Sequence, residues 1–146
     1  MSSLISETPA ASCAEAQAHF QSRLRFETDC SDVYHSQQAG DVDYVLVDVR
    51  GPAVFALGHV PGAINIPTRT MTAERLAAFG SDTLFVVYCA GPHCNGVHRA
   101  AATLAGLGYA VKEMLGGVTG WLDEGLPLVG GTPPRNAATN AMSCGC

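Results

Sequence analysis

The residues best suited to chemistry stand together in one short segment, residues 89–99. Cys89 opens this segment, and a second thiol, Cys94, follows five residues later. The thiolate form of a cysteine is the nucleophile in covalent catalysis and in disulfide exchange. The remaining candidates for binding or proton transfer in the segment are His93, His98 and Arg99. This set of residue types indicates cysteine chemistry directed at a small or anionic substrate.

The elements on either side of the segment explain how Cys89 would be positioned. Residues 83–88, Thr-Leu-Phe-Val-Val-Tyr, form an apolar β-branched and aromatic run that predicts a buried strand. An Ala/Leu-rich pattern over 99–107 predicts a helix after it. A thiol between a strand end and a helix N-terminus faces backbone N–H groups, which favour the thiolate. The alternative interpretation of Cys89 is a buried structural cysteine at a strand end.

The charge distribution and the composition of the loop after Cys89 favour the binding of an anionic ligand. No Asp or Glu occurs from residue 83 to residue 112, although the chain as a whole has a net charge of −5. Gly91 and Gly96 allow the backbone to curl, Pro92 stiffens it, and several N–H groups around one point form an anion-binding nest. The predicted anion-binding loop consists of Ala90, Gly91, Pro92, His93, Asn95, Gly96, Val97, His98 and Arg99.

Strands and helices alternate along the chain, which predicts an α/β fold. The expected strands are 44–49, 63–66, 84–88 and 110–115, and the expected helices are 10–26, 29–38, 53–57, 70–79, 99–107 and a short one around 121–122. This order implies a parallel central sheet with helices on both faces, and ligands bind such sheets beyond the carboxyl ends of the strands. Cys89 lies at such an end.

Length and composition limit the remaining possibilities. The chain has 146 residues, which suits one domain, and its acidic balance argues against a nucleic-acid or membrane-surface partner. No apolar run is long enough to cross a bilayer, and the N-terminus lacks the features of a secretory signal. We therefore expect a cytoplasmic protein, in which reactive or metal-binding roles are favoured for its cysteines over a disulfide framework.

We divide the chain into three parts. Residues 1–40 are expected to form an N-terminal helical extension packed on the domain, residues 41–129 the domain itself, and residues 130–146 a flexible C-terminal tail rich in Gly, Pro and Ser. The tail ends in two cysteines, Cys144 and Cys146, which are either a sulfur relay, soft-metal ligands or without function. Cys13 and Cys30 are expected to be inert.

Four motifs in order resemble the rhodanese-like domains, over roughly residues 45–128. They are Asp48-Val-Arg50, the segment Gly-His-Val-Pro-Gly-Ala-Ile-Asn-Ile-Pro at 58–67, Val-Val-Tyr-Cys at 86–89, and Gly-Gly-Val-Thr-Gly-Trp at 116–121. The loop departs from the common short Cys-Arg-x-Gly-x-Arg/Thr turn. It is similar to a variant with Cys-x-Gly-Pro-x-Cys-Asn-Gly, in which a second thiol is present.

The resemblance implies a single rhodanese-like domain with sulfurtransferase activity and no cofactor or metal. In such an enzyme Cys89 takes a sulfane sulfur from a donor such as thiosulfate and passes it from a persulfide to a thiol or cyanide. Cys89 has the family's position at the strand end, so Cys94 is expected as a second, resolving thiol or a ligand to the persulfide. Asp48 and Arg50 are expected to support the loop base. The sequence leaves the oligomeric state undetermined.

Three other functions remain open from the sequence. One is a non-catalytic, regulatory or sulfur-carrier module of the same family. A phosphatase or arsenate reductase needs an Arg after a five-residue gap from the Cys, and neither Cys89 nor Cys94 has one at that spacing. A zinc or soft-metal site would draw on Cys89, His93, Cys94 and His98, but their spacing matches no structural zinc motif.

Overall fold

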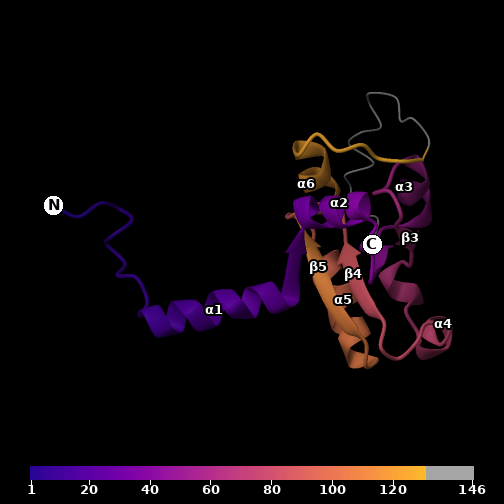
Figure 1. Ribbon diagram of the computed structural model, residues 1–146, viewed down its shortest axis with the longest axis horizontal. Coiled ribbons are helices and arrows are strands. Elements are labelled where there is room, and N and C mark those ends of the chain that lie inside the picture. The colour runs from indigo at the N-terminus through magenta and orange to yellow at the C-terminus, as the bar shows by residue number, and fades with distance from the viewer. Residues whose placement is uncertain (131–146) are drawn as a thin grey trace.

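The computed structural model describes residues 1–130, which form a five-stranded parallel sheet with helices on both faces (Figure 1). The strand order is β1-β5-β4-β2-β3, and every neighbouring pair is parallel. The strands are β1 (Glu27–Asp29), β2 (Val45–Asp48), β3 (Ile64–Asn65), β4 (Leu84–Tyr88) and β5 (Ala110–Leu115). The α/β fold class predicted from the sequence is confirmed.

The helices are α1 (Cys13–Phe26), α2 (Cys30–Ala39), α3 (Pro52–Leu57), α4 (Ala73–Leu76), α5 (Gly96–Gly106) and α6 (Gly117–Asp123), with a 3₁₀ turn, η1, at Thr68–Thr70. Their ends follow ordinary capping rules. The Asp29 side chain accepts the N–H of Asp32 at the start of α2, and Gly40 ends that helix in the left-handed conformation.

Two apolar clusters hold the sheet between its helix layers. On one face, Val47, Phe85 and Val87 pack with the inner residues of α4 and α5, including Leu76 and Leu104. On the other face, the cluster contains Cys30, Val33, Leu46, Val86, Met114, Val118 and Trp121, from α2, α6 and the strands. β2 and β4 are therefore buried on both sides, which accounts for their continuous apolar sequences.

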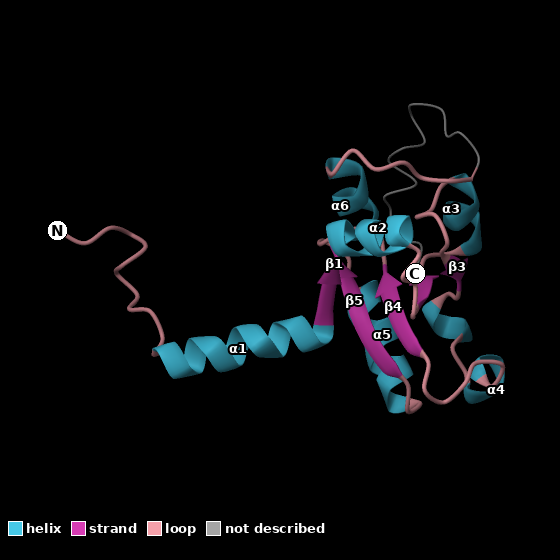
Figure 2. Cartoon of the chain, viewed as in Figure 1, coloured by secondary structure: helices cyan, strands magenta, loops and turns pink. Residues whose placement is uncertain are grey.

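The N-terminal region differs from the packed helical extension expected for residues 1–40. α1 has no buried residue, and it projects away from the sheet (Figure 2). Residues 27–40 instead belong to the domain, because β1 pairs with β5 and α2 covers the sheet. The two tail cysteines, Cys144 and Cys146, lie outside the described residues.

Within residues 1–130, no helix combines the length and apolar character that crossing a bilayer requires.

Candidate active site

Cys89 lies directly after β4, in the middle of the sheet's carboxyl edge. Its side chain is 2% exposed and belongs to the cluster formed with α4 and α5. On either side of β4, β2 ends at Asp48, which is in register with Tyr88, and β5 continues two residues past Glu113, the partner of Val87. The strand therefore fixes the cysteine between two neighbouring strand ends, as the sequence predicts.

The loop after Cys89 brings the second thiol back to the first. A turn forms at 91–94, in which the N–H of Cys94 donates to the carbonyl oxygen of Gly91 at 3.1 Å. The two sulfur atoms, Cys89 Sγ and Cys94 Sγ, lie 2.9 Å apart. This distance exceeds the 2.03–2.05 Å of a disulfide bond, so the sulfurs are in contact but not bonded to each other.

The start of α5 directs a backbone N–H at the second sulfur. The N–H of Gly96 donates to Cys94 Sγ at 3.4 Å. α5 begins at Gly96, three residues before the start predicted from the sequence. The prediction began the helix later because the Asn95-Gly96 pair is more typical of a loop. This contact fixes the position of the second sulfur relative to the start of α5.

A small cavity adjoins both sulfurs. Its volume is about 80 Å³, compared with roughly 30 Å³ for one molecule of liquid water. The lining residues are Cys89, Gly91, Pro92, Cys94, Val97, His98, Glu113, Met114, Leu115, Gly116 and Gly117. A space of this size suits a small anion or the end of a thiol compound.

Four of the nine predicted loop residues line this cavity, and the other five lie around it. Gly91, Pro92, Val97 and His98 line it beside Cys94, whereas His93, Asn95 and Arg99 are exposed. Ala90 is fully buried beneath the loop. Its carbonyl oxygen accepts two hydrogen bonds from Thr119, one from the backbone N–H at 2.9 Å and one from the hydroxyl at 3.1 Å.

Gly96 also belongs to the predicted anion-binding loop. It is buried, and its backbone N–H donates to Cys94 Sγ, as described above.

Glu113 is a lining residue that the sequence analysis missed. Its carboxylate lies 3.3 Å from the imidazole Nε2 of His98, at the side of the cavity. The segment from 83 to 112 has no carboxylate in the sequence, but β5 runs beside β4 and brings the next residue to the site. Only knowledge of the strand register could have identified Glu113 as a neighbour of the loop.

α6 closes the site from the other side through close backbone contacts. The N–H of Val118 donates to the carbonyl oxygen of Cys89 at 3.1 Å. Gly117 has a φ of +56°, and a Cβ atom there would clash with the carbonyl oxygen of Cys89 and lie 3.0 Å from the nitrogen of Gly91. Only glycine allows α6 to approach the cysteine this closely.

Asp48 and Arg50 form a fully buried ion pair at the base of the site. Arg50 Nη2 lies 2.7 Å from Asp48 Oδ2, and Arg50 Nε donates to both carboxylate oxygens at 3.0 and 3.1 Å. The same Nη2 also donates to the carbonyl oxygen of Gly58 at 2.7 Å, and so ties β2 to the 58–67 segment. Burial, and then the nearby Asp48 carboxylate, raise the pKa of Tyr88 well above its usual value. The Asp48–Arg50 pair therefore has structural contacts: the two residues bond each other, and Arg50 also bonds Gly58.

The four residues considered for a zinc site do not assemble into one. Among residues 1–130, no group of three or more His, Cys, Asp or Glu side chains is arranged to hold a metal ion.

Cys30, which the sequence analysis had considered inert, is buried against the carbonyl oxygens of Leu115 and Gly117, each 3.6 Å from its sulfur. Burial, followed by the charges of Asp29 and Glu124, raises the pKa of the Cys30 thiol to about 11.

Comparison with known families gives a match to the rhodanese-like domain over residues 30–124. The chain belongs to this family. The family resemblance inferred from the four sequence motifs is therefore confirmed.

Named relatives differ in their overall organisation. A sulfurtransferase of Allochromatium vinosum is 34% identical over 96 residues, which cover 64% of this chain and 87% of that protein. The HTH-type transcriptional regulator Rv0324 of Mycobacterium tuberculosis is 37% identical over 103 residues, which cover 70% of this chain. The chain spans only 44% of the length of that regulator.

Among solved structures, the BH2092 protein from Bacillus halodurans has a similar fold. It superposes with a TM-score of 0.79 at 29% sequence identity, over 88% of this chain and 99% of that one. The similarity therefore extends along almost the whole length of that structure.

Proposed function

We propose that this protein is a sulfurtransferase that carries a sulfane sulfur on Cys89. The observation that supports this most directly is the position of Cys89 at the end of β4, beside an 80 Å³ cavity. Membership of the rhodanese-like family and the 34% identity to a named sulfurtransferase support the same reaction class. The proposed substrates are a small sulfur donor, such as thiosulfate, and a thiol acceptor.

The reaction proceeds in two steps. The Cys89 thiolate attacks the outer sulfur of thiosulfate, a new sulfur–sulfur bond forms, and sulfite leaves with the electron pair of the broken bond. The thiolate of an acceptor then attacks the outer sulfur of the Cys89 persulfide and restores the Cys89 thiolate. Covalent catalysis of this kind divides one difficult transfer into two easier displacements.

Cys94, in its reduced form, is the proposed second thiol. Its sulfur lies 2.9 Å from Cys89 Sγ and accepts the N–H of Gly96. The Cys94 thiolate attacks the inner sulfur of the Cys89 persulfide, which forms a disulfide between the two cysteines and releases the outer sulfur as hydrosulfide. A thiol reductant then opens that disulfide and resets the enzyme.

Intact mass spectrometry after thiosulfate treatment tests the nucleophile. We expect the wild-type chain to gain one sulfur atom, and Cys89→Ser to gain none. Cys30→Ser is the matched control, because it removes another buried thiol outside the cavity lining and should leave the gain unchanged. Absence of any gain in both the wild type and Cys94→Ser, where the internal attack cannot remove the sulfur, would contradict the proposed chemistry. A gain that persists in Cys89→Ser would contradict the proposed site.

The same measurement followed over time tests the second thiol. In Cys94→Ser the persulfide should persist longer than in the wild type, because the internal attack is absent. Hydrosulfide released without an added acceptor should fall in that variant. Equal persulfide lifetimes in the two proteins would remove Cys94 from the reaction.

A regulatory module is the second candidate function. The 37% identity to a transcriptional regulator favours it, since that protein combines a similar region with additional sequence. A stable Cys89 persulfide without turnover to cyanide or thiol acceptors would favour this function over the enzyme.

A further inference from the structure

The first observation concerns α1, a helix without a partner in its own chain. It contains 14 residues, none of which is buried. Isolated helices of this length are marginal in water, and most helices in proteins are stabilised by packing of one face. Figure 1 shows α1 extending away from the sheet as a separate arm. Such a helix needs a surface outside its own domain.

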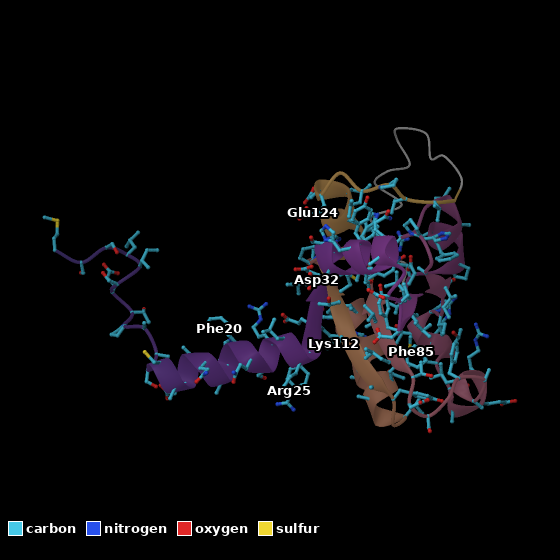
Figure 3. The ribbon with its side chains drawn as sticks, in the orientation of Figure 1. Phe20, Arg25, Asp32, Phe85, Lys112 and Glu124 are labelled. Atoms are coloured by element: carbon cyan, nitrogen blue, oxygen red, sulfur yellow. The ribbon has the colours of Figure 1, made fainter. Side chains whose placement is uncertain are left out.

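The arm has an apolar stripe suited to such a surface. Cys13, Ala16, Phe20 and Leu24 follow one another at intervals of three, four and four residues, which places them on one side of a helix. Phe20 is 58% exposed and Leu24 is 71% exposed. Figure 3 shows the Phe20 side chain standing out from the arm. Exposed apolar side chains at this spacing are typical of a protein–protein contact.

The junction with the sheet holds the arm outward. α1 ends at Phe26 and β1 begins at Glu27, so no linker separates them. Lys112 Nζ on β5 donates to the carbonyl oxygen of Leu24 at 2.9 Å, and Arg23 forms an ion pair with Glu27 at 3.1 Å. These contacts fix the corner, and folding of the arm back onto its own domain would break them.

The domain offers a groove that its own helices leave open. α2 crosses the sheet near the carboxyl ends of the strands, and the lower parts of β4 and β5 stay uncovered on that face (Figure 2). Two adjoining hollows of about 200 and 520 Å³ lie there and share Tyr44. We name them together the α2 groove, lined by Thr28, Asp32, Val33, Ser36, Gln37, Gln38, Val42, Tyr44, Val45, Leu46, Pro61, Gly62, Leu84, Val86 and Lys112.

Charge favours a second copy of the chain as the occupant. The lining of the α2 groove carries one carboxylate, Asp32, and one ammonium group, Lys112, so its charges cancel. Its acidic rim consists of the exposed Asp41 and Asp43, which flank the lining residue Val42. Residues 27–130 hold eleven carboxylates against five Arg and Lys side chains, whereas α1 has one carboxylate and two arginines, Arg23 and Arg25. The arm is thus the positively charged part of an acidic chain, and its charge is opposite to that of the Asp41 and Asp43 rim.

We propose that two copies exchange their α1 arms, each arm lying in the α2 groove of the other copy. The apolar stripe of α1 then covers the open part of the sheet, and Arg25 faces the acidic rim, while Arg23 keeps its ion pair with Glu27. The arrangement is a closed two-fold dimer, because the same arm and the same groove are used twice.

Light scattering on the full-length chain across a concentration series tests the dimer. The wild type should have twice the 15.2 kDa mass of one chain. Phe20→Glu on the arm and Val42→Glu in the groove should each raise the dissociation constant by about tenfold or more, because each places a charge in the apolar contact. Leu107→Glu, on an exposed apolar residue at the end of α5, is the matched control and should leave the dimer intact.

A mixture of the two disruptive variants identifies the exchange itself. In a pair made from one Phe20→Glu chain and one Val42→Glu chain, the unchanged arm of the second chain lies in the unchanged groove of the first. A dimer of either variant alone has no contact in which both the arm and the groove are unchanged. The mixture should therefore associate more tightly than either variant alone. A monomeric wild type would overturn the proposal. A dimer weakened by Phe20→Glu but unaffected by Val42→Glu would also overturn it, in favour of direct pairing between the two arms.

Discussion

The backbone N–H of Val118 donates a hydrogen bond to the carbonyl oxygen of Cys89, with 3.1 Å between nitrogen and oxygen. This bond joins the proposed nucleophile to α6, a helix nearly thirty residues later in the chain. Gly117 makes the contact possible, because its φ of +56° and its lack of a Cβ atom let α6 reach the cysteine. The position of Cys89 therefore depends on the second Gly of the 116–121 motif.

Gly117→Ala is expected to disturb both stability and the site. Its Cβ would clash with the Cys89 carbonyl oxygen in a backbone conformation that alanine rarely adopts. We expect a loss of roughly 2 kcal/mol or more in the free energy of unfolding, together with slower persulfide formation. Urea denaturation and mass spectrometry measure these two effects.

Gly125→Ala provides the matched control for this change. Gly125 also has a positive φ, +73°, but no atom lies within 4 Å of the added Cβ. It should lose only about 1 kcal/mol, the cost of the backbone conformation alone. If both variants lose the same stability and react at the same rate, the close contact with Cys89 does not matter.

Removal of one partner from the buried ion pair is expected to be costly. In Arg50→Met, the Asp48 carboxylate stays in a fully buried position without its guanidinium partner. Loss of one member of a buried pair typically costs about 3–5 kcal/mol. Urea denaturation of the variant measures this loss in the free energy of unfolding.

Two further variants separate the ion pair from a general effect of arginine removal. Arg75→Met changes an exposed arginine on α4 and should alter stability by no more than about 0.5 kcal/mol. The double variant Asp48→Leu/Arg50→Met should lose less than the sum of the two single losses, because no buried charge is left alone. Strictly additive losses would contradict this interpretation.

The sequence predicted the central strands well because burial on both faces imposes continuous apolar runs. β4 and β5 have the predicted bounds, and β2 lies within its predicted range. β1 was missed because Glu27-Thr28-Asp29 is short and polar, and it exists as a strand only through pairing with β5. Tertiary pairing, rather than local propensity, decides such edge strands.

The site was partly predictable for the same reason. A thiol at a strand end is visible in the sequence, and so is a loop rich in glycine. The contact between the two sulfurs depends on the turn at 91–94, and the presence of Glu113 depends on strand register. Neither follows from residue types and spacing, because both arise from segments brought together by the fold.

Stability is expected to depend on Cys30 at high pH. Its thiol has a pKa of about 11 in the folded protein, against an ordinary value of 9.0. Between these values the unfolded chain loses the proton while the folded chain keeps it, so the unfolded state binds fewer protons. The free energy of unfolding therefore falls as the pH rises from 9 to 11, by an amount on the order of 2 kcal/mol.

Urea denaturation of the wild type and of Cys30→Ala at several pH values measures this contribution. The difference between the two proteins isolates Cys30 from the tyrosines, which also ionise at high pH. That difference should be constant below pH 9 and should shrink between pH 9 and 11. A difference that stays constant throughout this range would refute the raised pKa.

Glu113 is expected to weaken the binding of anionic donors to the proposed site. Its carboxylate lines the same cavity as Cys89 and lies beside His98, so it repels a donor such as thiosulfate. Two unit charges about 4 Å apart interact by roughly 1 kcal/mol even in water. Glu113→Gln should therefore lower the KM for thiosulfate about fivefold, and added salt should reduce the difference between the two proteins.

Glu74→Gln, an equal charge change on exposed α4, should leave KM unchanged. A KM that is unaltered or higher in Glu113→Gln would mean that the donor does not approach through this cavity.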